Sequence, residues 1–183
     1  MMPSNYVEQI DGIEFIQLKP VTDSRGSFLK FHPLQALKQS LDSVALSFNP
    51  KQGTVRGLHF QVEPFAEEKL ISCVQGSIFD VAVDLRMNSK TFGKWTSIAL
   101  NSENALQVFM PKGIAHGFQT LSPNSIVHYC LSSSYSPESS YAINPFGDLD
   151  IRWPLMTFLV SEKDSAGISF SVAAKKYADS ITA

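Results

Sequence analysis

The sequence contains little charge, and neither sign dominates it. Only 17% of its 183 residues are Asp, Glu, Lys or Arg, and the formal net charge at pH 7 is -2. A surface that binds nucleic acid needs a strong basic excess, so this composition argues against DNA or RNA as a partner. No apolar run approaches the roughly 20 residues of a membrane helix, which argues against membrane insertion. Residues 1–5 carry neither the basic nor the apolar segment of a signal peptide.

Cysteine is also scarce. The two cysteines, Cys73 and Cys130, lie far apart, and no C-x-x-C pair is present. This spacing excludes zinc knuckles and dithiol redox motifs. Both cysteines lie in apolar, strand-like runs, which is typical of buried free thiols. We therefore expect a cytoplasmic protein.

Apolar core material, in contrast, is plentiful: 44% of the residues are hydrophobic, and 13 are Phe. Short runs of alternating apolar and polar residues, separated by Gly and Pro, favour strands over helices. The clearest run spans 77–86, and we expect a hairpin-like turn through Gln75, Gly76 and Ser77 to join it to a strand at 70–74. Further strands are expected at 15–18, 55–61, 96–100, 106–110, 117–121 and 125–131, and short helices at 33–41 and 172–180. The prediction is an all-β, cupin-type jelly-roll sandwich with a few short helices, forming a single domain over 1–183.

Two of these strands carry reactive side chains on a face that a sandwich would turn inward. His59 and Gln61 share one face of their strand, so His59 points either to solvent or into a ligand cavity. Lys69 shares a face with Ile71, although lysine is almost never buried without a partner. An inward Lys69 would place a cation where it can stabilise a developing oxyanion, whereas an edge lysine would extend to solvent.

A third stretch contains half of a cupin metal-binding signature. Pro111, Gly113 and His116 fit the spacing P-x-G-x-x-H, in which the histidine is often a metal ligand. The other half of the signature normally supplies two histidines, but here it supplies His59 followed by Gln61. Two imidazoles and one amide make a poor transition-metal site, so we expect no bound metal.

Two further residues admit both a structural and a chemical interpretation. Tyr129 lies on an apolar strand face, where its hydroxyl needs either a structural partner or a substrate. Asp164 follows Ser161 with the Ser-x-x-Asp spacing of a capping box. Alternatively, Asp164 supplies a carboxylate that orients a histidine and stabilises its imidazolium.

Several motifs, in one order along the chain, resemble the dTDP-4-dehydrorhamnose 3,5-epimerase family. The resemblance covers nearly all of residues 11–166. The motifs are RGLHFQ at 56–61, FDVAVDLR at 79–86, TFGKW at 91–95, the stretch 111–120, YSP at 135–137, WP at 153–154 and EKD at 162–164.

The resemblance implies a metal-free, cofactor-free epimerase that inverts the ring carbons beside the 4-keto group of a dTDP-linked sugar. Such a reaction belongs to rhamnose and surface-polysaccharide synthesis. It needs a base, a stabiliser for the enolate and an acid on the opposite face of the ring. By resemblance His59 is the base, oriented by Asp164. Lys69 stabilises the enolate oxygen, and Tyr129 returns the proton.

The resemblance also implies residues that bind the substrate and a homodimer. Tyr135 matches the aromatic residue that stacks on thymine, and His116 lies in the substrate pocket. The remaining substrate contacts implied by the resemblance are Arg25, Ser47, Asn49, Arg56 and Lys163. The N-terminal segment, about 1–30, is expected to reach across the dimer with Arg25. The C-terminal tail, about 167–183, is expected to be peripheral.

Three positions depart from the family pattern at substrate contacts. Lys30 and Ser140 stand where the family commonly has Glu, and Ser47 replaces a usual Gln. The reactive set is unchanged, so proton abstraction is predicted more firmly than the identity of the nucleotide and sugar. The alternatives are a single-centre epimerase on a related keto sugar, a metal-dependent cupin enzyme and a non-catalytic sugar-binding cupin.

Overall fold

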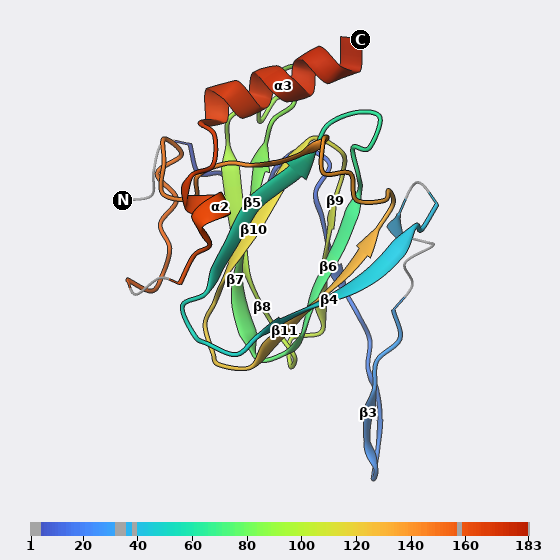
Figure 1. Ribbon diagram of the computed structural model, residues 1–183. Coiled ribbons are helices and arrows are strands. Elements are labelled where there is room, and N and C mark those ends of the chain that lie inside the picture. Colours follow the sequence, from blue (N-terminus) through green and yellow to red (C-terminus); the bar gives the residue numbers. More distant parts are fainter. Residues whose placement is uncertain (1–4, 32–35, 38–39, 157–158, 183) are drawn as a thin grey trace.

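Two five-stranded antiparallel sheets face each other and form the body of the protein (Figure 1). The computed structural model describes residues 5–31, 36–37, 40–156 and 159–182. Sheet A has the strand order β12-β5-β10-β7-β8, sheet B has the order β1-β9-β6-β11-β4, and β2 and β3 form a separate hairpin. The strands are β1 (Glu14–Gln17), β2 (Val21–Asp23), β3 (Gly26–Phe28), β4 (Ser43–Asn49), β5 (Val55–Gln61), β6 (Lys69–Gln75), β7 (Ser77–Asp84), β8 (Trp95–Asn101), β9 (Leu106–Met110), β10 (Ile114–Thr120), β11 (Ser125–Leu131) and β12 (Ser140–Ala142).

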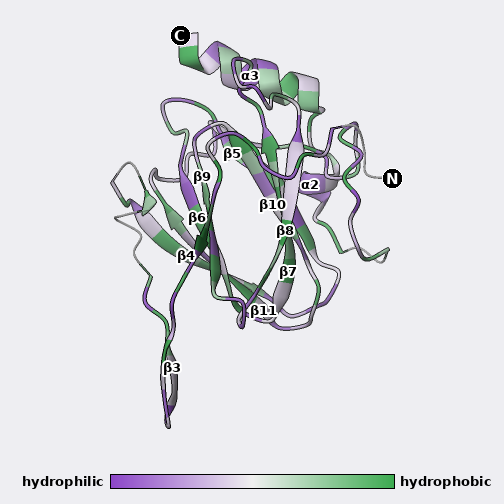
Figure 2. Ribbon diagram, turned by 180° about the vertical axis from the view of Figure 1, so that it is seen from behind, coloured by the Kyte–Doolittle hydropathy of each residue, from purple (hydrophilic) through white to green (hydrophobic). Residues whose placement is uncertain are grey.

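Apolar residues fill three layers, one between the sheets and one on the outer face of each. The layer between the sheets joins Ile71 and Val127 of sheet B to Ile78 and Phe118 of sheet A. The outer face of sheet A packs against the C-terminal third of the chain, and the outer face of sheet B carries a smaller cluster around Leu70. In Figure 2, hydrophobic stretches run through strands of both sheets. Sheet A is therefore buried on both faces.

The all-β sandwich predicted from the sequence is confirmed, and three strands, β5, β9 and β11, have the predicted bounds. The other predicted strands are observed with ends shifted by one to three residues. The strands β2, β3, β4 and β12 were not predicted. The two cysteines are buried free thiols, as expected.

The predicted hairpin at Gly76 is wrong. The strand before it, β6, belongs to sheet B, whereas the strand after it, β7, belongs to sheet A. A single residue between two strands is too short for a hairpin loop, which needs at least about two residues. Gly76 has φ +74°, and a Cβ there would lie 2.5 Å from Ser125 Oγ. Gly76 therefore lets the chain pass sharply from one sheet to the other.

Helix is limited to short segments. The predicted helix at 33–41 falls largely outside the described residues, while the predicted C-terminal helix is present as α3 (Phe170–Thr182). Helix α3 lies across one end of the sandwich (Figure 1) and buries Ala173, Ala174 and Tyr177 in the outer layer of sheet A. A one-turn helix, α2 (Glu162–Ser165), lies beside β5. No helix in the described part of the chain is long and apolar enough to cross a membrane.

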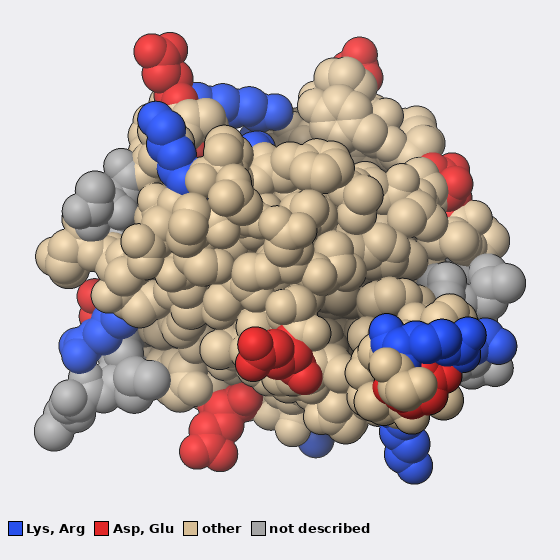
Figure 3. All heavy atoms as spheres, turned by 90° about the horizontal axis from the view of Figure 1, so that it is seen from below, with Lys and Arg blue, Asp and Glu red and all other residues tan. Residues whose placement is uncertain are grey.

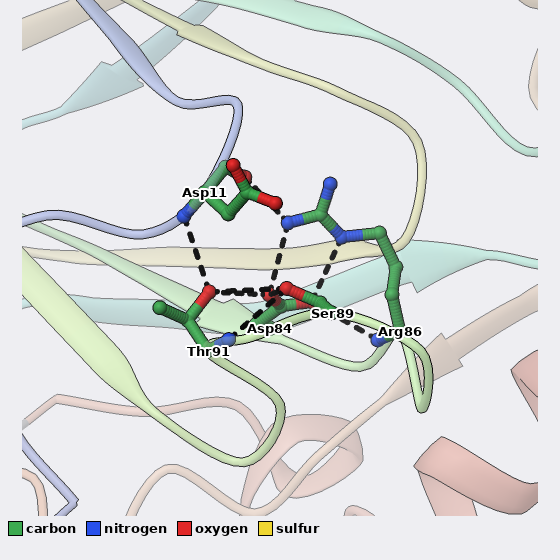
Figure 4. A network of polar contacts seen from close by, with 5 residues as sticks. All are labelled: Asp11, Asp84, Arg86, Ser89 and Thr91. Atoms are coloured by element: carbon green, nitrogen blue, oxygen red, sulfur yellow. Dashed lines mark hydrogen bonds and ion pairs between the residues drawn. The ribbon is translucent and has the colours of Figure 1, made fainter.

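A buried carboxylate ties the N-terminal segment to sheet A (Figure 4). Asp84 is fully buried and accepts hydrogen bonds from Arg86, Ser89 and Thr91, while Arg86 also donates to the backbone carbonyl of Asp11. Burial raises the pKa of Asp84, but these hydrogen bonds outweigh it and hold the pKa below its usual value. The network thus holds a charge inside the fold by surrounding it with donors.

The surface charges do not gather by sign on the face seen from below. Figure 3 shows Lys and Arg beside Asp and Glu around the rim of that face, with a broad uncharged middle. On this face the distribution agrees with the near-neutral composition, and the described residues form no basic stripe there of the kind that binds a phosphate backbone.

Candidate active site

A cavity of about 310 Å³ opens between the two sheets. Strands β5 and β10 of sheet A and strands β4, β6 and β11 of sheet B contribute side chains to it. The lining residues are Ser47, Arg56, His59, Phe60, Gln61, Glu67, Lys69, His116, Phe118, Tyr129, Leu131, Tyr135, Ser140 and Lys163. The cavity therefore gathers most of the reactive residues singled out in the sequence.

His59 is held by a carboxylate at the wall of this cavity. Its Nε2 lies 2.7 Å from Asp164 Oδ1, and its side chain remains 45% exposed. Asp164 is buried, and its second oxygen accepts the backbone N–H of Gly57 at 3.1 Å. Since an ionised carboxylate can only accept, Nε2 carries the proton, and the lone pair of His59 lies on Nδ1.

The position of Asp164 depends on a helix cap. Ser161 is the N-cap of α2, and its Oγ accepts the backbone N–H of Asp164 at 3.1 Å. Burial raises the pKa of Asp164, but hydrogen bonds from His59, Gly57 and Ser161 outweigh it, so the pKa lies below its usual value. The structure therefore shows both the cap at Ser161 and a hydrogen bond between the carboxylate of Asp164 and His59.

Gly57 allows the two strands that carry the histidines to approach closely. It has φ +105°, and a Cβ at this position would lie 2.6 Å from the backbone oxygen of His116. The register between β5 and β10 shifts just beyond the pair of His59 with His116. A larger residue at 57 would push the strands apart.

Lys69 points inward, which decides between the two positions that the sequence left open for it. Its side chain is only 7% exposed, and its ammonium group donates to the backbone carbonyl of His59 at 3.1 Å. The same ammonium forms a 3.3 Å ion pair with Glu67, whose side chain is 11% exposed. Sequence analysis did not single out Glu67. The only available signal was its position two residues before Lys69, on the same side of the chain.

Tyr129 reaches the cavity from the other sheet, on β11. Burial raises the pKa of its phenol well above the usual value of 10, the carboxylate of Asp80 raises it further, and Arg56 opposes this effect. The ring of Tyr129 meets the ring of His116 edge to face, with centroids 5.9 Å apart. At neutral pH Tyr129 is therefore a protonated acid.

His116 has a carboxylate partner of its own. Its Nε2 lies 2.6 Å from Asp80 Oδ1, and both side chains are almost fully buried. Sequence analysis treated Asp80 as the polar side of an alternating strand. Because β7 is buried on both faces, that polar side lies inside the sandwich. An aspartate alternating with large apolar residues on a central strand was the available signal.

Two of the predicted substrate contacts, Arg56 and Lys163, form a cationic wall of the cavity. Arg56 Nε donates to Asn49 Oδ1 at 2.8 Å, and Ser47 Oγ donates to the same oxygen at 3.3 Å. Asn49 is buried and does not line the cavity itself, so it fixes the direction of Arg56. Tyr135, 66% exposed, and Lys163 of α2 also line the cavity.

Arg25 lies apart from this cavity. It is at the tip of the β2–β3 hairpin, which projects away from the sandwich (Figure 1), and it is paired with Asp23 at 2.6 Å. Within one chain the structure therefore does not bring Arg25 to the other predicted site residues.

A cluster of metal ligands is not found among the described residues. No group of three or more His, Cys, Asp or Glu side chains is placed to hold an ion in residues 5–31, 36–37, 40–156 and 159–182. His116, the histidine of the partial cupin signature, hydrogen-bonds to Asp80 instead.

Comparisons with known proteins find a family model and relatives that match most of the chain. A family model described as dTDP-4-dehydrorhamnose 3,5-epimerase matches residues 8–171. The chain is 40% identical to the dTDP-4-dehydrorhamnose 3,5-epimerase of Sinorhizobium fredii, over 84% of this chain and 83% of that protein. It is also 32% identical to a dTDP-4-dehydrorhamnose 3-epimerase of Streptomyces niveus, over 90% and 82% of the two chains.

A solved structure shows the same arrangement of strands. The dTDP-6-deoxy-D-glucose-3,5-epimerase of Legionella pneumophila, in complex with dTDP-4-keto-L-rhamnose, superposes with a TM-score of 0.83 at 36% identity. The match covers 90% of each chain.

Proposed function

Since the chain belongs to the dTDP-4-dehydrorhamnose 3,5-epimerase family, we propose that His59, Lys69 and Tyr129 perform an epimerisation in the cavity between the sheets. The membership confirms the predicted cupin-type fold and the predicted activity, an epimerase of a dTDP-linked 4-keto-6-deoxy sugar. The roles of the individual residues rest on their geometry.

The reaction starts at a C–H bond beside the keto group. Nδ1 of His59 takes this proton, and Asp164 stabilises the imidazolium that forms. The electron pair of the broken C–H bond moves into the enolate, whose oxygen faces the ammonium of Lys69. Tyr129 then donates its phenolic proton to the same carbon from the opposite face. One proton leaves and one returns, so the step requires no oxidant or reductant.

The observation that carries this assignment is the separation of base and acid onto different sheets. His59 lies on β5 of sheet A and Tyr129 on β11 of sheet B, and both line one cavity. Inversion needs proton removal and proton return on opposite faces of a ring, and a sugar lying between the sheets would present one face to each.

Deuterium incorporation tests the assignment. The protein is incubated with dTDP-4-keto-6-deoxyglucose in deuterated water, and proton NMR follows the sugar positions C3 and C5. We expect deuterium at these carbons, and we expect His59→Ala to abolish the exchange. Normal exchange in the His59→Ala variant would show that another group is the base.

The same spectra decide between two centres and one. Deuterium at both C3 and C5 supports the 3,5-epimerase, and deuterium at C3 alone supports the single-centre reaction named for the Streptomyces niveus relative. Binding without any exchange would support the non-catalytic alternative. Activity that is lost with a chelator and restored by a metal would support the metal-dependent one.

The cationic wall suits a nucleotide diphosphate. Arg56 and Lys163 line the cavity, and Asn49 holds the guanidinium of Arg56 in place. Hydrogen bonds between such cations and phosphate oxygens are among the strongest in proteins. We propose that the exposed ring of Tyr135 stacks on the base, while Ser47 and His116 contact the base and sugar.

A homodimer is part of the proposal. The side chains of Val44, Leu46 and Phe48 are 50–63% exposed on one face of the edge strand β4. Three large apolar side chains in a row on an edge strand favour pairing with another surface. In such a dimer the projecting β2–β3 hairpin can bring Arg25 to the cavity of the second copy. The cytoplasmic location stays a prediction from the sequence.

A further inference from the structure

Glu67 is a carboxylate among cations in the wall of the cavity. Among the described lining residues it is the one acidic side chain, beside Arg56, Lys69 and Lys163. Its side chain is only 11% exposed, and burying a carboxylate is costly unless it is paired. Its partner is Lys69, at 3.3 Å. The function proposed above gives Glu67 no role.

Lys69 is held from two directions. The backbone carbonyl of His59 accepts one of its N–H groups at 3.1 Å, and Glu67 attracts the ammonium at 3.3 Å. A lysine ammonium has three donors, so donor capacity remains for a ligand in the cavity. A long, flexible side chain that is anchored twice loses its freedom before substrate arrives, rather than during the reaction.

We propose that Glu67 is a positioning residue that holds the Lys69 ammonium, together with the carbonyl of His59, at the place where the enolate oxygen develops. This inference rests on the proposed role of Lys69. It assigns Glu67 an action through Lys69 alone, without contact with the substrate. The anchor at His59 also links the ammonium to the strand that carries the base, so base and stabiliser keep a fixed distance.

A double-mutant cycle tests the proposal. The variants Glu67→Ala, Lys69→Ala and the double variant are compared with the unaltered protein by deuterium exchange and by kcat and KM. Glu67→Ala is expected to lower kcat about tenfold while KM changes less than about twofold, because the ammonium is misplaced but substrate contacts remain. In the Lys69→Ala background the same substitution should have no further effect.

Matched variants separate positioning from folding. Glu67→Gln keeps an oxygen acceptor and is expected to restore most of kcat. Glu63→Ala breaks another Lys–Glu ion pair, with Lys112 at 3.1 Å, outside the cavity, and should leave kcat unchanged. The ratio of inversion to exchange should also stay constant in Glu67→Ala, because Tyr129 is untouched.

The outcomes are distinguishable. An unchanged kcat in Glu67→Ala, or equal losses with and without Lys69, would overturn the proposal. An unchanged kcat in Lys69→Ala would instead remove the role of Lys69 itself, and with it the premise. The proposal is supported if Glu67→Ala lowers kcat while its melting temperature and oligomeric state stay normal. Glu67→Gln should then restore most of kcat.

Discussion

The imidazole of His59 and the carboxylate of Asp164, 105 residues apart in the sequence, share a 2.7 Å hydrogen bond. The bond leaves Nδ1 of His59 as the proton acceptor. It also joins the one-turn helix α2 to strand β5 of sheet A.

Asp164→Asn should impair the base without unfolding the protein. The amide keeps the shape of the side chain but does not stabilise an imidazolium, so we expect kcat to fall about 100-fold or more. Exchange and inversion should fall together, because both follow the same proton removal. Steady-state kinetics and deuterium uptake measure this, and an exchange rate equal to that of the unaltered protein would refute the role of Asp164.

Tyr129→Phe should separate the two halves of the reaction. The variant lacks the phenolic proton but keeps His59 and Lys69, so removal of the sugar proton continues. We expect completed inversion to fall about 100-fold or more, whereas exchange on the starting sugar falls much less. NMR in deuterated water reports both rates from one sample. A parallel loss of both rates would mean that Tyr129 takes part in the removal step.

Asp84→Asn should reduce stability in a pH-dependent way. The pKa of Asp84 is held below its usual value in the fold, so its stabilising contribution is present above the ordinary value of 3.8 and is lost as the pH falls through the folded pKa. Breaking this buried network should cost about 3 kcal/mol at pH 7. Urea unfolding from pH 7 to pH 3 should show the two proteins converging in acid. A constant difference across this range would contradict the assignment.

Phe48→Asp should dissociate the proposed dimer. The side chain is 63% exposed on the outer face of β4, and burying a new carboxylate at an apolar interface is costly. Light scattering should report a halved molar mass. Met156→Asp, at a side chain that is 86% exposed elsewhere, serves as the control and should leave the mass unchanged.

Mixing two defective variants tests whether Arg25 acts across the dimer. Arg25→Ala should raise KM, and His59→Ala should be inactive. In a mixed dimer, one cavity would combine an intact His59 with an intact Arg25 from the other copy. After exchange of subunits, roughly one quarter of the sites should recover a normal KM. If the normal KM does not return, Arg25 either acts on the cavity of its own chain or does not act at a cavity.

The sequence predicted much of the fold because apolar and polar residues alternate along most of the strands. The strand over Val55–Gln61 was found with its bounds, since Leu58 and Phe60 face one core and His59 and Gln61 the cavity. The strand β4 was missed, although Val44, Leu46 and Phe48 alternate with smaller residues. Its apolar face is exposed in the single chain, and the proposed dimer would cover it.

The site was predicted less completely, for a physical reason. Lys69 was recognisable because a lysine on an apolar face needs a partner, and the same reasoning should have led to that partner, Glu67. Asp80 was missed because alternation shows which residues share a face but not whether both faces are buried. The sheet to which a strand belongs depends on pairing between distant segments, as the link at Gly76 demonstrates.

The one-turn helix α2 has a consequence for the timing of activity during synthesis. All strands of the two sheets end by Ala142, and the helix that carries Asp164 follows them in the chain. Because a chain emerges from the ribosome N-terminal end first, the sandwich can close around His59, Lys69 and Tyr129 before the carboxylate exists. A nascent chain that does not yet extend past Asp164 therefore lacks the carboxylate that orients His59, and the site is complete only when the segment around Ser161 has folded onto β5.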